Sequence, residues 1–160
     1  MSKKKRVLLL ENIHALARDL FIQNGFEVEQ LKTALGPEEL KSKLKGFDVL
    51  GIRSKTHLTK DVLAASQHLE AVGCFCVGTN QVDLITANSM GIPVFNAPFS
   101  NTRSVAEMVI GEIVMLSRQL GTRNNEMHKG VWNKKSDKCF EVRGKTLGIV
   151  GYGNIGTQVS

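Results

Sequence analysis

The sequence predicts an α/β protein built on a parallel, doubly wound sheet. Short apolar segments alternate with segments of helical periodicity through residues 1–100, which is the pattern of successive βα units. Polar residues follow several of the apolar segments, and a glycine-rich turn follows the last one. With 42% hydrophobic and 22% charged residues, the 160-residue chain has the composition of an ordinary globular protein.

The apolar segments of this region are predicted to be strands, at residues 7–10, 26–31, 48–52, 71–77 and 93–96. The second strand alternates apolar with polar residues, which favours a position near the edge of the sheet. Proline opens the last strand, a place that sheets tolerate because proline cannot donate a ladder hydrogen bond.

Helices are predicted between these strands, at residues 13–24, 37–46, 60–68 and 83–90. The first has a periodic apolar face, which we expect to pack inward: Ile13, Leu16, Ala17, Leu20 and Phe21. Gly25 is placed to end this helix in the left-handed conformation. Leu40 and Leu44 are expected to point inward from the second helix. Thr59 is expected to cap the third helix, and Asp83 opens the fourth.

Residues 102–128 depart from this alternation and predict one long helix. Its surface is apolar apart from a narrow stripe through Glu107, Gly111 and Arg118. A helix that is apolar over most of its circumference must be buried on two sides. Two explanations remain open: a partner subunit covers one side, or the helix lies at the centre of a single large domain.

The last residues predict a strand, Leu147 to Val150, that leads into a G-x-G-x-x-G turn at Gly151, Gly153 and Gly156. In a dinucleotide-binding βαβ unit these glycines permit a tight turn, close approach of the pyrophosphate and close helix packing, in that order. The helix that receives the phosphates would begin near Asn154. The alternative is a glycine-rich loop without a ligand. Because the acidic ribose partner normally follows about 20 residues later, we expect the chain to be the front part of a longer protein.

Polar pairs follow the predicted strands: Arg53-Ser54, Thr79-Asn80 and Ser100-Asn101. Each alone is explained by a helix cap or a turn. Together they mark the carboxyl ends of parallel strands, where doubly wound sheets bind ligands. The net charge of +6 suits an anionic small molecule. We therefore predict a cleft that brings Arg53, Thr79 and Asn101 together around an anionic metabolite.

Several classes of protein are excluded or disfavoured. No apolar run approaches the roughly 20 residues that span a bilayer, and the basic residues 2–6 precede too short an apolar run for a signal peptide. Aromatic residues do not alternate with basic ones as in nucleic-acid grooves. Three cysteines, an odd number, favour reduced thiols in a cytoplasmic protein, and no ligand cluster indicates a metal. A phosphoacceptor receiver domain is excluded because it needs an acidic pair after the first strand and an aspartate at the end of the third, where this chain has Glu11-Asn12 and Arg53-Ser54.

Three stretches, Gly73 to Asp83, Gly91 to Pro98 and Phe99 to Glu107, resemble the D-isomer-specific 2-hydroxyacid dehydrogenases, and the likeness runs from Val7 to the end of the chain. The resemblance implies a flavodoxin-like substrate domain with a Rossmann NAD-binding domain inserted into it. Residues 1–100 would be the N-terminal part of the substrate-binding domain, and 101–160 the incomplete beginning of the NAD-binding domain. The implied reaction is NAD-dependent oxidation of 3-phosphoglycerate to 3-phosphohydroxypyruvate, the first step of L-serine biosynthesis.

The resemblance also implies roles for particular residues. Arg53, Ser54 and Asn101 would bind the substrate. The implied contacts to NAD are Thr79, Gly151, Gly153, Asn154, Ile155 and Gly156. The helix over residues 102–128 matches a segment that forms homo-oligomers.

The family's catalytic arginine, glutamate and histidine, its ribose-binding aspartate and its serine-binding regulatory domain all come from later sequence. We therefore expect no catalytic residue in this chain and no activity from it alone. Two alternatives stay open: an NAD-sensing corepressor on the same fold, and a sibling reductase of glyoxylate, hydroxypyruvate or another 2-keto acid. The choice between NAD and NADP is also open, because it depends on the ribose-binding residue.

Overall fold

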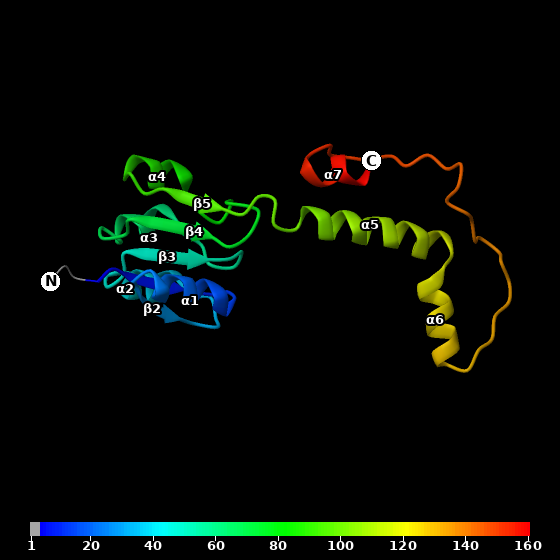
Figure 1. The fold of residues 1–160 in the computed structure, drawn as a ribbon, viewed down its shortest axis with the longest axis horizontal. Coiled ribbons are helices and arrows are strands. Elements are labelled where there is room, and N and C mark those ends of the chain that lie inside the picture. Colours follow the sequence, from blue (N-terminus) through cyan, green and yellow to red (C-terminus); the bar gives the residue numbers. More distant parts are fainter. Residues whose placement is uncertain (1–3) are drawn as a thin grey trace. The chain divides into compact units, whose positions relative to one another are not determined.

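The computed structural model describes residues 4–160, so Ser2 and Lys3 of the basic leading segment lie outside the described residues. The chain divides into two compact units (Figure 1). The first ends at Ser100 and the second spans Asn101–Ser160.

The first unit contains a five-stranded parallel sheet in the order β2-β1-β3-β4-β5. The strands are β1 (Arg6–Leu9), β2 (Glu27–Gln30), β3 (Val49–Ile52), β4 (Ala71–Cys74) and β5 (Val94–Asn96). This confirms the predicted parallel α/β class, and β2 occupies an edge as its alternating pattern indicated. The order is that of flavodoxin-like sheets.

Both faces of the sheet carry helices. They are α1 (Ala15–Gln23), α2 (Pro37–Leu44), α3 (Lys60–Ala64) and α4 (Leu84–Ser89). Successive strand residues point to opposite faces. Accordingly, Leu8 belongs to the core cluster of α2, α3 and α4, whereas Val7 belongs to a smaller cluster with residues of α1. Leu40 and Leu44 of α2 are fully buried, as predicted.

Local signals at the helix ends are confirmed at Gly25, Gly91 and Asp83 but not at Thr59. Gly25 and Gly91 have φ of +85° and +71°, the left-handed conformation that glycine adopts without strain. The Asp83 carboxylate accepts a hydrogen bond from the backbone N–H of Thr86 at 2.9 Å and so caps α4. Thr59 occupies the N-cap position of α3, but its side chain makes no capping hydrogen bond.

Three sequence predictions for this unit need correction. Leu16 and Leu20 of α1 are 60% and 50% exposed, because the small cluster beneath α1 takes up only the stripe through Ile13, Ala17 and Phe21. Helix α3 ends at Ala64 rather than near residue 68. Strand β4 ends at Cys74 rather than residue 77, because its last partners in β3 and β5 lie opposite Cys74.

The second unit contains α5 (Thr102–Ser117), α6 (Leu120–His128) and α7 (Asn154–Val159), and α5 packs against α7. The predicted long helix is interrupted at Gln119, whose φ of +53° is left-handed. The predicted strand from Leu147 to Val150 was wrong, because residues 101–160, all of them described, contain no other strand that could pair with it.

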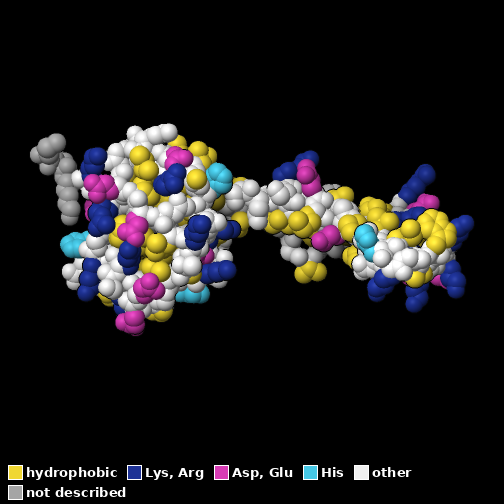
Figure 2. Space-filling model, turned by 90° about the horizontal axis from the view of Figure 1, so that it is seen from below, with side chains coloured by type: hydrophobic (Ala, Val, Ile, Leu, Met, Phe, Trp, Pro, Cys, Tyr) yellow, Lys and Arg dark blue, Asp and Glu magenta, His cyan; other side chains and the backbone are white. Residues whose placement is uncertain are grey.

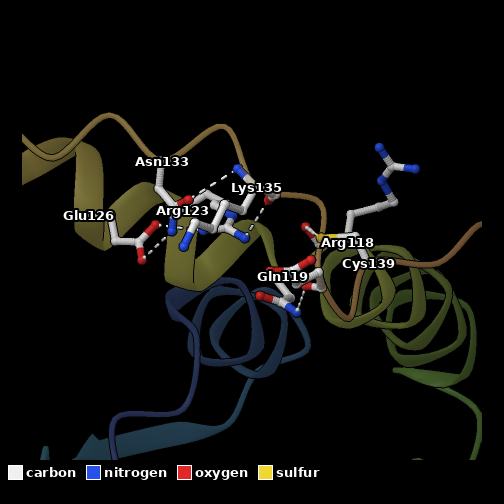
Figure 3. A network of polar contacts seen from close by, with 8 residues as sticks. Arg118, Gln119, Arg123, Glu126, Asn133, Lys135 and Cys139 are labelled. Carbon is white, nitrogen blue, oxygen red and sulfur yellow. Dashed lines mark hydrogen bonds and ion pairs between the residues drawn. The ribbon is translucent and has the colours of Figure 1, made fainter.

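A polar network holds the irregular segment after α6 against that helix (Figure 3). Arg123 pairs with Glu126, Nη1 to Oε2 at 2.9 Å, and its Nη2 donates to the carbonyl of Lys135 at 2.8 Å. Gln119 Nε2 donates to the carbonyl of Asp137 at 3.0 Å. The residue that breaks the long helix therefore also anchors the segment that follows.

The apolar surface of α5 is largely uncovered within its own unit (Figure 2). Only Thr102 and Ala106 of this helix are buried, whereas Met108 and Leu116 are 62% and 77% exposed. The predicted burial on two sides is therefore not found within residues 101–160. Among the described residues, no helix has the length and apolar character needed to cross a membrane.

Candidate functional site

A pocket of about 470 Å³ lies at the carboxyl ends of the adjacent strands β2, β1 and β3. Its lining consists of Glu11, Lys32, Thr33, Ala34, Arg53, Ser54 and Lys55. We call it the cationic pocket. Arg53 and Ser54 were predicted from the sequence, whereas Lys32 and Lys55 were missed. Both lysines lie within three residues of a strand end, so the same strand-end argument would have found them.

The three cations of the cationic pocket are available to a ligand. Lys32, Arg53 and Lys55 have exposed side chains, and none of them pairs with a carboxylate within residues 4–160. Lys32 and Arg53 also line a neighbouring pocket of about 770 Å³ beside α1. The Arg53 guanidinium offers a planar fork of donors that matches a carboxylate or phosphate. This arrangement suits a small anion with more than one acidic group.

Glu11 is the one acid of the cationic pocket, and it is 7% exposed. Its Oε1 accepts backbone N–H groups of Arg53 and Thr56 at 3.1 and 2.9 Å, and its Oε2 accepts that of Lys55 at 2.9 Å. Burial raises the pKa of Glu11, but hydrogen bonds from Thr56, Lys55 and Arg53 outweigh burial and hold the pKa below its ordinary value. Glu11 is therefore a carboxylate in this structure.

The backbone at Glu11 is strained. Glu11 and Asn12 have φ of +61° and +53°, a conformation that costs roughly 1–2 kcal/mol per non-glycine residue. Their N–H groups donate to the carbonyls of Thr33 at 3.1 Å and Leu31 at 3.2 Å, which ties the end of β1 to the segment after β2. Asn12 is a residue type that enters the left-handed region readily, but Glu11 is not, so the sequence gives no signal for the turn at Glu11.

Gln81 links the Arg53 loop to the predicted Thr79 loop. This buried amide donates from Nε2 to the carbonyl of Arg53 at 2.8 Å and lies 3.4 Å from the carbonyl of Gly78. Thr79 therefore lies with Arg53 at the carboxyl ends of the strands, although it lines neither of the two pockets. Sequence reasoning missed Gln81, because a glutamine in a polar turn gives no indication of burial.

Asn101 opens the second unit. It occupies the N-cap position of α5, but its side chain makes no capping hydrogen bond, and the residue is exposed. The carboxamide is thus free to contact a ligand. Its predicted meeting with Arg53 and Thr79 stays a prediction.

The glycine turn before α7 uses its three glycines differently. Gly151 has φ of +93°, which provides the tight turn. A Cβ at Gly153 would meet no atom within 4 Å, so the backbone there is open to a ligand. A Cβ at Gly156 would lie 2.3 Å from the carbonyl oxygen of Gly151, so only glycine fits. Asn154 begins α7 and Ile155 follows it, as the motif predicts.

No cluster of metal-ligating side chains is found in the part of the chain that the structure describes. Cys74, Cys76 and Cys139 are all free thiols. Cys74 is buried, and burial together with the neighbouring Cys76 raises the pKa of its thiol to about 11. It is therefore protonated at neutral pH and serves the core.

Comparison with known proteins relates this chain to one family. The family model described as D-isomer specific 2-hydroxyacid dehydrogenase, catalytic domain, matches residues 7–155. D-3-phosphoglycerate dehydrogenase 1 of Saccharomyces cerevisiae is 57% identical over 155 residues, covering 97% of this chain and 33% of the relative. D-3-phosphoglycerate dehydrogenase of Escherichia coli is 53% identical over 157 residues, covering 98% and 38%. The chain thus spans between a third and two fifths of these relatives.

Solved structures have the same fold. The TT0316 protein of Thermus thermophilus matches with a TM-score of 0.87 at 26% identity, covering 96% of this chain and 51% of that one. An NAD-dependent formate dehydrogenase of Staphylococcus aureus, in complex with NAD, matches with a TM-score of 0.80 at 25% identity. The match covers 96% of this chain and 51% of that one. D-lactate dehydrogenase of Aquifex aeolicus, complexed with NAD and lactic acid, matches at 0.80 but only 22% identity, covering 96% and 46%.

Proposed function

Because the chain belongs to the D-isomer specific 2-hydroxyacid dehydrogenase family, we propose that it carries the substrate-recognition part of an NAD-dependent 3-phosphoglycerate dehydrogenase. The reaction is oxidation of 3-phosphoglycerate to 3-phosphohydroxypyruvate, the first step of L-serine biosynthesis. In this proposal residues 1–100 belong to the substrate-binding domain and residues 101–160 begin the NAD-binding domain. The relatives named D-3-phosphoglycerate dehydrogenase support this choice of substrate.

The observation that carries the proposal is the cationic pocket. The cationic residues Lys32, Arg53 and Lys55 line it together with Ser54. Among residues 4–160 the Ser54 N–H has no acceptor. A substrate with one carboxylate and one phosphate supplies acceptors for all of these groups. Asn101 stays a proposed further contact to the substrate carboxylate.

The glycine turn fits a dinucleotide. The open backbone at Gly153 and the close packing at Gly156 leave space for a pyrophosphate at the start of α7, so Gly151, Asn154 and Ile155 are proposed to hold it. Thr79 stays a proposed cofactor contact. The nicotinamide, when bound, supplies the acceptor for the hydride that leaves the substrate.

We propose that this chain alone does not catalyse the reaction. Oxidation of a hydroxyl group requires a base that takes its proton. The single carboxylate or imidazole lining the cationic pocket is Glu11, and hydrogen bonds from three N–H groups already occupy it. A steady-state assay for NADH production by the purified chain tests this, and measurable turnover contradicts it.

We further propose homo-oligomerisation through α5 and α6. The exposed apolar side chains of α5 support this choice over burial within one domain. A cytoplasmic location is also proposed, supported by the three free thiols.

The direct test is a titration of the 160-residue chain with 3-phosphoglycerate, in which the NMR signals of the backbone amides are monitored. We expect shifts at Arg53, Ser54 and Lys55. Arg53→Ala is expected to weaken binding about tenfold or more, because a charge-assisted hydrogen bond is lost. Lys45→Ala removes a cation before β3, at the amino ends of the strands and away from the cationic pocket. It is expected to leave the affinity unchanged.

Comparison ligands separate the alternatives. D-glycerate lacks the phosphate, so equal binding of D-glycerate and 3-phosphoglycerate favours a sibling 2-keto acid reductase. Binding of NAD without any binding of 3-phosphoglycerate favours a cofactor-sensing protein. Amide shifts confined to residues outside the cationic pocket contradict the proposed site.

A further inference from the structure

Glu11 is an unexpected residue for an anion pocket, because its charge has the same sign as the ligand. Its carboxylate forms no ion pair with Lys32, Arg53 or Lys55 in the described chain. It binds backbone N–H groups of the β3–α3 loop instead.

The side chain of Glu11 organises one wall of the pocket. It takes three of the four N–H groups between Arg53 and Thr56, at 2.9–3.1 Å. The remaining N–H, that of Ser54, has no acceptor among the described residues. A run of converging N–H groups forms an anion-binding concavity. With Glu11 bound to the other three, Ser54 is the residue left to donate to a ligand.

The backbone of Glu11 holds the opposite wall. Its N–H donates to the carbonyl of Thr33, and that of Asn12 donates to Leu31, so the two bonds flank Lys32 along the chain. Thr33, Lys32 and Ala34 line the pocket across from the Arg53 loop. One strained residue thus joins both walls, and the positive φ at Glu11 and Asn12 is the turn that permits it.

We propose that Glu11 is the positioning residue of the cationic pocket: it sets the separation of Lys32 and Arg53 and leaves the Ser54 N–H for the substrate anion. The inference rests on the proposed function, because it requires that the pocket bind an anion. Hydrogen bonds from the N–H groups stabilise the carboxylate, and the three cations Lys32, Arg53 and Lys55 of the same pocket outweigh its single negative charge.

The variant Glu11→Gln tests this, because two explanations of the role of Glu11 predict opposite changes in the affinity for anions. If Glu11 acts only through its charge, removal of a negative charge tightens anion binding. If it positions the walls, the amide loses an acceptor, and its NH₂ group faces an N–H donor of Lys55 or of Arg53 and Thr56. We expect the dissociation constants of inorganic phosphate and 3-phosphoglycerate to rise about tenfold or more. The amide signals of Arg53, Lys55 and Thr56 should shift as well.

The matched control is Glu27→Gln, which makes the same substitution at the exposed first residue of β2. This residue lies at the amino ends of the strands, whereas the cationic pocket lies at their carboxyl ends. Binding by Glu11→Gln that equals or exceeds that of the wild type overturns the inference and leaves the proposed function intact. Failure of the wild type to bind either anion overturns the proposed function and this inference with it.

A measurement on the wild type decides the matter if the variant does not fold. The amides of Arg53, Lys55 and Thr56 should exchange slowly with solvent, whereas that of Ser54 should exchange quickly and be the one most shifted by phosphate. Fast exchange at Arg53, Lys55 and Thr56, or a phosphate shift that bypasses Ser54, overturns the inference.

Discussion

At the scale of single residues, Glu11 shows how a carboxylate can be stable at low exposure without a cationic partner. Burial raises its pKa, and hydrogen bonds from Thr56, Lys55 and Arg53 more than compensate, so the pKa is lowered. A carboxyl group with a lower pKa in the folded than in the unfolded chain stabilises the fold above its ordinary pKa. That contribution disappears as the pH falls through the folded pKa.

We therefore expect the stability effect of Glu11→Gln to depend on pH. At pH 7 the variant should unfold with a free energy about 2 kcal/mol lower, from weakened hydrogen bonds to a charged group. The difference should shrink as the pH falls below the ordinary value of 4.5. Urea unfolding followed through NMR signals of β1 and β3 measures this. A difference that is constant between pH 7 and pH 3 contradicts it, and Glu27→Gln provides the control.

At the scale of elements, the glycine turn and α7 form a small unit with a strict steric requirement. Gly156 is buried, and the carbonyl oxygen of Gly151 occupies the space that a side chain would need. Backbone cannot move aside as a flexible side chain can. The third glycine of the motif is therefore required by packing, whereas packing places no such requirement on the second, Gly153.

We expect Gly156→Ala to disrupt the turn at a cost of about 1–3 kcal/mol. Backbone chemical shifts of residues 149–159 should move toward random-coil values. Gly153→Ala introduces the same methyl group where no atom lies within 4 Å and φ is −91°, so these shifts should stay near those of the wild type. Native-like shifts in Gly156→Ala would contradict the steric argument.

At the scale of the whole molecule, α5 exposes apolar side chains such as Met108 and Leu116 that would be more stable if they were buried. Exposed apolar surfaces of this kind mark sites where a protein contacts another molecule. The proposed oligomer would bury these side chains by packing α5 against a second copy of the chain.

We expect the chain to self-associate, and Leu116→Glu to weaken association, because Leu116 is 77% exposed and a buried carboxylate opposes an apolar contact. Light scattering over a range of concentrations measures this. Leu16→Glu makes the same change at an exposed leucine of the first unit and should leave association unchanged. A wild type that stays monomeric at high concentration contradicts the proposal.

Part of the candidate site was predictable from the sequence. Arg53 and Ser54 follow a strand, and the strand-end rule places them at a pocket without knowledge of any contact. The roles of Glu11 and Gln81 were not predictable, because they depend on hydrogen bonds to loops that lie far away in sequence. A carboxylate and an amide near turns are ordinary surface residues until the loops they bind are known.

By itself the sequence determined the parallel α/β fold, the Asp83 cap and the glycine turns, because apolar periodicity and backbone conformation act over a few residues. Asp83, Gly25 and Gly151 are examples of such local determination. Only the tertiary structure decided that Leu16 stays exposed, that residues 147–150 form no strand and that Glu11 joins the two walls of the cationic pocket. Those outcomes depend on which distant segments supply a packing surface or a hydrogen-bond partner, and a local pattern contains no information about the partner.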